Sequence, residues 1–504
     1  MSIAPTADIE RAPSDPLILF AVAAACVTLA DWLFFGWDIG ISLAQFLGLL
    51  GVVAVTCNRV HAMRGTQIVM SAVFIAGLLA LIEDVSALSV MIGMLATGLF
   101  VVVMTDHEAA TWQRSLLEAV ILPLRGPFQL AEDFFRASSQ LAQAGIPDWM
   151  RTGSLIAWIV PVGAFAIFLY LFSAANPLIE YELTRIDLQA LAFDPRQIGF
   201  WILVFCAIWP LILRRVRTKA VREPEPAIAS TKAPFDWDYL FGAQALLRSL
   251  ILCNALFALQ SALDLAYLWG GVALPNGMSH AEYAHRGAYP LVATALLAAG
   301  FALIAMRPNG PADNSQSIRP LVLAWIGQNI LLVISSIFRL DLYIAAFSLT
   351  YLRIAAFIWM GLVATGLALM LIQIVYRKSN AWLLSANAIS LALVLCGCCF
   401  LNAPWLVAYY NVEHCREIGG SGPNLDMEYL TSLGSPQTLP PIEAHLKQFP
   451  AVRLLSTAYR ESPDRHFLSR SGNWRAWTFR RWRLERYFAN TPGTSFNSPD
   501  NGKG

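Results

Sequence analysis

The amino-acid sequence predicts an all-α membrane protein, a bundle of about eleven spanning helices with a small C-terminal helical domain outside the membrane. Hydrophobic residues make up 57% of the chain and charged residues only 14%. A soluble protein of this size needs more charged surface than that. The apolar residues also fall in blocks close to the ~20 residues that a helix needs to cross a bilayer. Lipid is therefore the expected environment of most of the chain.

The predicted spans are apolar runs of helical length, separated by polar turns or loops. They lie near residues 17–35, 39–57, 66–83, 85–105, 154–175, 197–213, 246–269, 288–306, 320–338, 354–375 and 382–405. Only Glu83 and Asp84 divide the third span from the fourth, so we expect a tight hairpin with both acids at the surface. Residues 341–353 are too short to span and predict a separate outer-surface or re-entrant helix.

Loops and linkers divide the chain further. The expected parts are a cytoplasmic tail (1–16), a six-span region (17–213), a basic and Pro-rich connector (214–240), a five-span region (241–410), a helical tail domain (411–489) and a disordered end (490–504). Within the six-span region, residues 106–153 alternate apolar and charged residues with helical spacing. They predict either a pair of amphipathic helices at the membrane interface or a lid packed on the spans.

The distribution of Arg and Lys predicts the orientation of the spans. Most of these residues fall in the alternate loops that share a side with the N-terminus, and few fall in the others. The N-terminus is therefore expected to be cytoplasmic, and an odd number of spans places the C-terminus outside. The Arg-rich C-terminal tail opposes this assignment, but long tails weigh less in the rule. No basic signal sequence with a cleavage site precedes the first span, which predicts a retained anchor.

The richest polar stretch runs from residue 253 to 290. Gln260, Asp264 and Tyr267 have the spacing of one helix face, about a turn and a half below the interface that Trp269 marks. An acid at that depth is expected to face protein or a water-filled cavity. It is either a ligand- or proton-binding group or an acid anchored by its two neighbours and water. The full candidate polar site is Gln260, Asp264, Tyr267, His280, Glu282, Tyr283, His285 and Arg286.

A metal site in this stretch is disfavoured by geometry. His280 and His285 are five residues apart, so on a helix they point roughly 140° away from each other. Glu282 also fits a capping box with Ser279. We therefore expect no metal and no cofactor.

The tail after the last span predicts short helices: one from 424 to 434 with Asn424 as N-cap and Gly434 as its end, and two opened by Pro. A final segment mixes tryptophan with arginine. Its residues Trp474, Arg475, Trp477, Arg480, Arg481, Trp482 and Arg483 are expected to dock onto anionic lipid headgroups. Such a mixture also suits single-stranded nucleic acid, but the membrane topology and a net charge of +1 argue against that partner.

Three groups of residues resemble an uncharacterised family of bacterial multi-span inner-membrane proteins, domain of unknown function 4173. They are Asn254, Gln260 and Asp264 with YLWGG at 267–271 and HAEYAHRGAYP at 280–290; LTYLR with IWMGLVATGLAL at 349–369; and Asn402, Tyr410, Asn411 and Val412 with LDMEYLTSLG at 425–434. The resemblance covers about 240 to 450; the N-terminal spans share only hydropathy and the break at Asn176-Pro177. It implies a multi-pass inner-membrane protein and supplies no catalytic residues.

The favoured function is a non-enzymatic binding, sensing or transport-associated component with a polar site at the outer face. One alternative is a membrane-embedded enzyme that acts on a lipid or envelope precursor, with Asp264, His280 or His285 as acid or base. No nucleotide-binding loop, nucleophile elbow or zincin spacing supports an enzyme. The other alternative is a structural partner of another envelope protein. Membrane lipids are the expected partners, and the oligomeric state stays open.

Overall fold

The structure is a computed structural model. It describes residues 16–58, 65–105, 111–143, 194–214, 243–269, 317–420, 422–445 and 473–490, and these are helical with no strand among them. The chain forms two compact units. The first comprises Met1–Val221 and Ser469–Trp482, and the second comprises Arg222–Leu468 and Arg483–Gly504.

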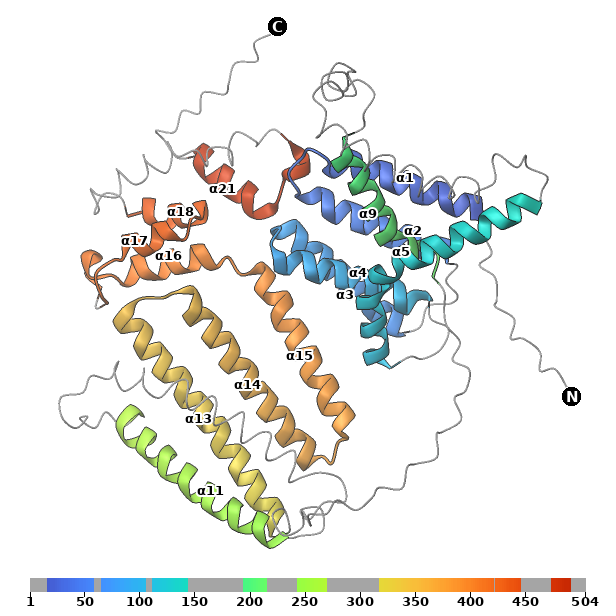
Figure 1. Cartoon of the computed structure of the whole chain (residues 1–504). Coiled ribbons are helices and arrows are strands. Elements are labelled where there is room, and N and C mark those ends of the chain that lie inside the picture. Colours follow the sequence, from blue (N-terminus) through green and yellow to red (C-terminus); the bar gives the residue numbers. More distant parts are fainter. Residues whose placement is uncertain are drawn as a thin grey trace, which may run out of the picture. The chain divides into compact units, whose positions relative to one another are not determined.

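The described part of the first unit contains six long helices (Figure 1). They are α1 (Pro16–Phe34), α2 (Ile41–Cys57), α3 (Gly65–Glu83), α4 (Ala87–Thr105), α5 (Trp112–Gln143) and α9 (Pro195–Ile212). Helices α3 and α4 form a hairpin, as the sequence predicts. Helix α9 packs against both α1 and α5.

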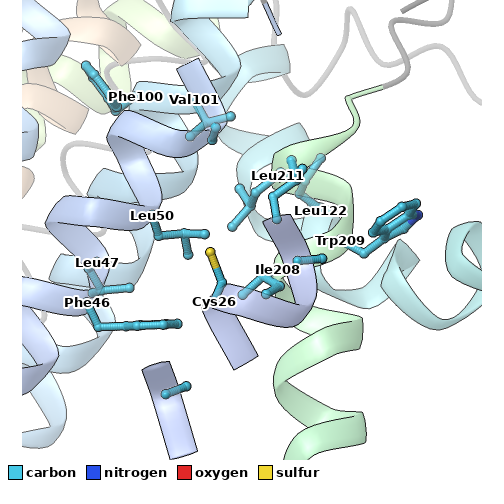
Figure 2. Packing of buried hydrophobic residues seen from close by; sticks show 14 of the residues in the cluster. Cys26, Phe46, Leu47, Leu50, Phe100, Val101, Leu122, Ile208, Trp209 and Leu211 are labelled. Atoms are coloured by element: carbon cyan, nitrogen blue, oxygen red, sulfur yellow. The ribbon is translucent and has the colours of Figure 1, made fainter. Parts of the chain in front are cut away.

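The core of this unit is apolar and closely packed. Figure 2 shows Cys26 of α1, Leu47 and Leu50 of α2 and Ile208 of α9 within one cluster of buried side chains. Small residues let α3 and α4 approach each other, because a Cβ added at Gly77 would lie 2.8 Å from the Cβ of Ala96. Small residues at helix contacts are typical of packing inside membranes.

The second unit holds the remaining helices, which Figure 1 shows in green to red. They are α11 (Ala243–Asp264), α13 (Ile318–Phe347), α14 (Tyr351–Val375), α15 (Asn380–Phe400), α16 (Ala403–His414), α17 (Met427–Ser432), α18 (Leu439–Glu443) and the greater part of α21 (Phe479–Asn490). The division between the units falls within α21, after Trp482.

Seven helices in the described residues are long and apolar enough to cross a membrane, and α1 and α2 are shorter apolar helices. Many of their large apolar side chains are exposed, for example Leu384, Ile389 and Leu393 of α15. Exposed apolar area on this scale requires a lipid or protein environment. The predicted spans at 154–175 and 288–306 lie outside the described residues.

Several predicted boundaries are wrong. Residues 341–347 complete α13 instead of starting a separate helix, and the chain turns where Ser348 adopts a φ of 68° and Thr350 caps α14. The eleventh span, predicted to reach 405, ends at Phe400, because Asn402 caps a new helix, α16. The N-cap of α17 is Asp426, not Asn424, because its side chain accepts from the Tyr429 N–H.

For residues 106–153 the sequence left open a pair of amphipathic helices or a lid packed on the spans; the described part is not a pair, and it packs on α4 and α9. Helix α5 is a single helix of 32 residues that continues through Pro123 and Pro127. The two prolines are four residues apart, so both missing N–H groups lie on one face of the helix and the opposite face keeps its hydrogen bonds.

Candidate functional site

A buried ion pair joins two apolar helices of the second unit. The Nη2 of Arg339 on α13 forms a salt bridge with the Oδ1 of Asp264, the last residue of α11. The side-chain amide of Gln260, one turn earlier on α11, donates to the same oxygen at 3.0 Å. Asp264 is 1% exposed and Arg339 is 2% exposed. Both charges are therefore removed from water and lipid.

The two helices run parallel, side by side (Figure 1). The Asn254 amide donates to the Leu321 carbonyl at 3.1 Å, and the rings of Phe257 and Trp325 meet edge to face at 5.9 Å. The Asp264–Arg339 ion pair lies further toward the C-terminal ends of both helices. Sequence numbers thus rise together on α11 and α13, which fixes their relative direction. The Arg339 side chain reaches back toward the start of its helix, as long side chains on helices do.

The backbone changes immediately after the acid. Residues Leu265–Trp269 continue α11 as a turn of π-helix. Such turns are rare and occur frequently at functional sites. The hydroxyl of Ser261 and the side-chain carbonyl of Gln328 are buried and have no hydrogen-bond partner in the described part of the chain. These two helices, α11 and α13, therefore carry buried polar groups in addition to the ion pair.

The turn between α13 and α14 is held by the tail domain. The Asn411 side chain accepts the Leu349 N–H at 2.6 Å and donates to the Leu349 carbonyl at 2.9 Å. The Tyr429 hydroxyl accepts the Tyr351 N–H at 3.0 Å. This turn lies about two helical turns beyond Arg339 along α13. It fixes the end of the helix that carries the buried arginine.

A second polar cluster lies in the first unit, where residues 473–482, which we name the C-terminal segment, contact the N-terminal helices. The Arg475 guanidinium lies 4.4 Å from the ring centre of Trp32 and 4.7 Å from that of Trp37. The ring of Trp474 completes the surroundings at 5.4 Å. Three indoles thus enclose one cation.

The backbone of the C-terminal segment also touches the start of α2. The Ile41 N–H donates to the Trp477 carbonyl at 2.7 Å. A Cβ at Gly40 would lie 2.3 Å from the carbonyl carbon of Ala476, so the close approach requires glycine at position 40.

The segment reaches the α3–α4 hairpin through Arg480. Its Nη1 donates to the Oδ2 of Asp84 at 2.9 Å, and its Nε lies 3.5 Å from the Oε1 of Glu83. The prediction that both acids are at the surface is therefore wrong for Glu83, which is 9% exposed. The reason is that a distant part of the chain covers the hairpin, which the local sequence does not reveal.

The other ends of α2 and α4 are joined by Arg214. Its Nη2 contacts the Glu118 carboxylate at 2.7 Å and its Nη1 reaches Thr105, while its N–H donates to the side chain of Asn58 at 3.0 Å. Arg114 binds the same carboxylate at 3.1 Å. Burial raises the pKa of Glu118, but the two arginines outweigh it, so its pKa lies below the ordinary 4.5.

The described residues contain no group of three or more His, Cys, Asp or Glu side chains that is placed to hold a metal ion. The arrangement in the second unit brings together a guanidinium, a carboxylate and an amide.

The sequence model of a family described as Domain of unknown function (DUF4153) matches residues 69–445. The chain belongs to this family. The family number expected from the sequence, 4173, is thus corrected to 4153. No curated protein and no solved structure matches the chain.

The DUF4153 match includes the ion pair and the α13–α14 turn, whereas Trp32, Trp37 and the C-terminal segment lie outside it. The structure confirms that Gln260 and Asp264 share a helix face, and it places Tyr267 half-buried in the π-turn. The other candidate residues, His280, Glu282, Tyr283, His285 and Arg286, lie outside the described residues.

Sequence reasoning missed Arg339 in this DUF4153 protein, because the predicted ninth span ends at residue 338 and leaves Arg339 in the loop that follows. A signal was present in Asp264, a lone acid in an apolar run that needs a basic partner, but Arg339 lies at the end of its apolar run, two residues before Asp341. Intramembrane charges are expected to pair with each other.

Among the residues expected to dock on lipid, Arg475 and Arg480 bind the protein's own side chains. Trp474 is exposed, and Trp482 stacks on Phe479 with ring centres 5.5 Å apart. Lipid docking by the other residues of this set stays a prediction.

Proposed function

We propose that this DUF4153 protein is a multi-pass protein of the bacterial inner membrane that binds a small acidic ligand at the Arg339–Asp264 pair, as a binding or transport-associated component. The buried ion pair between two apolar helices carries the proposal. Burying such a pair stabilises a fold poorly, because desolvation offsets the attraction between the charges. Charged residues inside membrane helices commonly mark binding or ion-conducting sites.

The chemistry of the two partners suggests how the site works. Arginine keeps its charge in every environment and presents a planar fork to carboxylate or phosphate oxygens. Asp264 supplies one such oxygen. A ligand with the same oxygen geometry can take its place, while the half-buried Gln260 amide, which now donates to Asp264, and the buried Ser261 hydroxyl offer further hydrogen bonds. Asp264 is then an internal competitor of the ligand.

Two features support an odd number of crossings, which places the two termini on opposite sides of the membrane; the distribution of Arg and Lys then supports an N-terminus inside and a C-terminus outside. Because α11 and α13 run parallel, the chain leaves one end of the pair at Trp269 and returns at Ser317 at the other end. An additional crossing between them is consistent with this. The C-terminal segment contacts the turns that begin α2 and end α3. With α1 entering from the cytoplasm, both turns are external.

The experiment measures thermal unfolding of purified protein in a neutral maltoside detergent, with a panel of small carboxylates and phosphates. The wild type is expected to gain melting temperature with at least one acidic compound. Asp264→Asn removes the competing charge, so the gain is expected to grow. Arg339→Gln removes the receptor cation, so the gain is expected to vanish.

Arg319→Gln is the matched control, because Arg319 lies at the start of the same helix, where its Nη2 donates to the Ile374 carbonyl. It is expected to respond like the wild type. Equal ligand responses of wild type, Asp264→Asn and Arg339→Gln would assign the pair to scaffolding. The enzyme alternative stays a prediction, because His280 and His285 lie outside the described residues.

A further inference from the structure

The C-terminal segment is held on the first unit by directional contacts rather than by a shared apolar core. The described members of that core come from α1–α5 and α9, and none comes from residues 473–482. The contacts of the segment include cation–π, ionic and backbone hydrogen bonds, together with the ring contact of Trp474 with Trp32 at 5.8 Å between ring centres. Interfaces of this composition resemble those between a domain and a peptide ligand.

One half of the receiving surface is aromatic. Trp32 and Trp37 flank the Arg475 guanidinium, yet they remain 54% and 50% exposed. Indole faces attract cations through their quadrupole, and tryptophan is the strongest of the three aromatic residues in this role. The two side chains form a cage for a guanidinium that stays accessible from outside.

The other half is acidic. Glu83 and Asp84 end the α3 helix and begin its turn, and both contact Arg480. Between the two halves, the surface contacts the backbone of the segment. Ala476 packs closely on Gly40, and the Ile41 N–H donates a hydrogen bond to the Trp477 carbonyl. The surface thus contacts two arginines five residues apart, Arg475 and Arg480, and the main chain between them.

We propose that Trp32, Trp37, Gly40, Ile41, Glu83 and Asp84 form a peptide-binding site for an arginine- and tryptophan-containing segment, with residues 473–482 as its resident, dissociable occupant. The occupant connects the α1–α2 and α3–α4 hairpins. This site belongs to the first unit and is independent of the ligand proposed for the second. Because the occupant is part of the same chain, its effective concentration is high and it excludes free peptides of the same kind.

The test is a binding competition on the full chain in nanodiscs of zwitterionic lipid. The probe is a dye-labelled synthetic peptide of residues 473–482, capped at both ends. The full chain with Arg475→Ala and Arg480→Ala has a weakened occupant and is expected to bind the probe. The wild-type chain is expected to bind it at least about tenfold more weakly, because its own segment fills the site. A probe with both arginines replaced by alanine is expected not to bind.

Adding Trp32→Ala and Trp37→Ala to the opened chain is expected to abolish probe binding. Adding Trp359→Ala instead removes a tryptophan of equal exposure, 53%, from α14 of the second unit and is expected to change nothing. Circular dichroism and gel filtration establish that each variant is folded. No binding to a folded opened chain, or equal binding to the opened and wild-type chains, would overturn the proposal. Probe-bridged or segment-exchanged dimers in gel filtration would assign the occupant to a second copy, which also overturns it.

Discussion

Arg339 and Arg480 each pair with carboxylates, but in different surroundings. Arg339 and its partner Asp264 are almost completely enclosed between α11 and α13. Arg480 lies at the start of α21 and contacts the α3–α4 turn, where the Asp84 side chain is 34% exposed. The first pair is built into a helix contact, and the second holds one segment onto a surface. The same ionic contact therefore has a different energetic role in each unit.

Solvent access explains the difference. Removing one member of a fully buried pair leaves an uncompensated charge, whereas the loss is smaller where one partner is partly exposed, because water and salt can reach the Asp84 carboxylate. The following predictions test this contrast, from the largest expected effect to the smallest.

Arg339→Met is expected to destabilise the second unit by about 3–5 kcal/mol, because Asp264 then stays buried without its cation. The double variant Asp264→Leu/Arg339→Met is expected to recover most of that loss, because it removes both charges. Thermal unfolding in detergent measures both. If Arg339→Met alone were as stable as the wild type, water would have to reach Asp264. The Arg339 and Arg480 sites would then not differ in solvent access.

Gly40→Ala is expected to cost about 1–3 kcal/mol of segment docking, because the new methyl group overlaps the backbone of Ala476. Hydrogen exchange of residues 473–482 is the measurement, and faster exchange is expected. The matched control is Gly48→Ala on the same helix, where the nearest atom, Leu78 Cδ1, lies at an ordinary 3.5 Å. Unchanged exchange in Gly40→Ala would contradict the close approach of the segment.

Arg480→Gln is expected to weaken docking by about 1 kcal/mol, the upper end of the range for exposed pairs, because Asp84 is partly exposed while Arg480 and Glu83 are largely buried. The effect is expected to shrink in 1 M salt, because the Debye length falls to about 3 Å. The effect of Arg339→Met is expected to persist there. Hydrogen exchange of both variants at low and high salt measures the two effects. An equal salt response at Arg339 and Arg480 would contradict the difference in solvent access between the two sites.

Acidification gives the smallest expected effect, at Glu118. Its pKa is lowered in the folded state, so its contribution to stability is fully present above the ordinary value of 4.5 and is lost as the pH falls through the lower, folded value. Stability of the first unit is expected to decline below about pH 4.5. Glu118→Gln is expected to flatten that part of the profile. Thermal unfolding from neutral to acidic pH checks the slope, and a steeper decline in the variant would contradict the sign.

The sequence predicted features that depend on local periodicity. Apolar runs located the described long helices, and i, i+4 spacing placed Gln260 beside Asp264. Helix ends were less predictable where polar residues compete as caps, as at Asn424 and Asp426. A single apolar run also concealed the turn at Ser348.

The distant partners were beyond sequence reasoning. Asp264 and Arg339 are separated by 75 positions, and Asp84 and Arg480 by 396. Charge and hydropathy identify residues that need a partner, but many arginines satisfy that requirement equally. Only the packing of the helices determines which arginine becomes the partner. In the same way, packing determines that Asn411 pairs with the backbone of Leu349.

The closing contact of the first unit has a consequence for biosynthesis. Arg480 is translated 396 positions after Asp84. At bacterial and eukaryotic elongation rates of about 5–20 residues per second, the ribosome needs on the order of 20–80 s to cover that interval. During that time Glu83 and Asp84 are without their partner Arg480. A nonsense mutation late in the gene would make this loss permanent, and would therefore destabilise helices near the N-terminus.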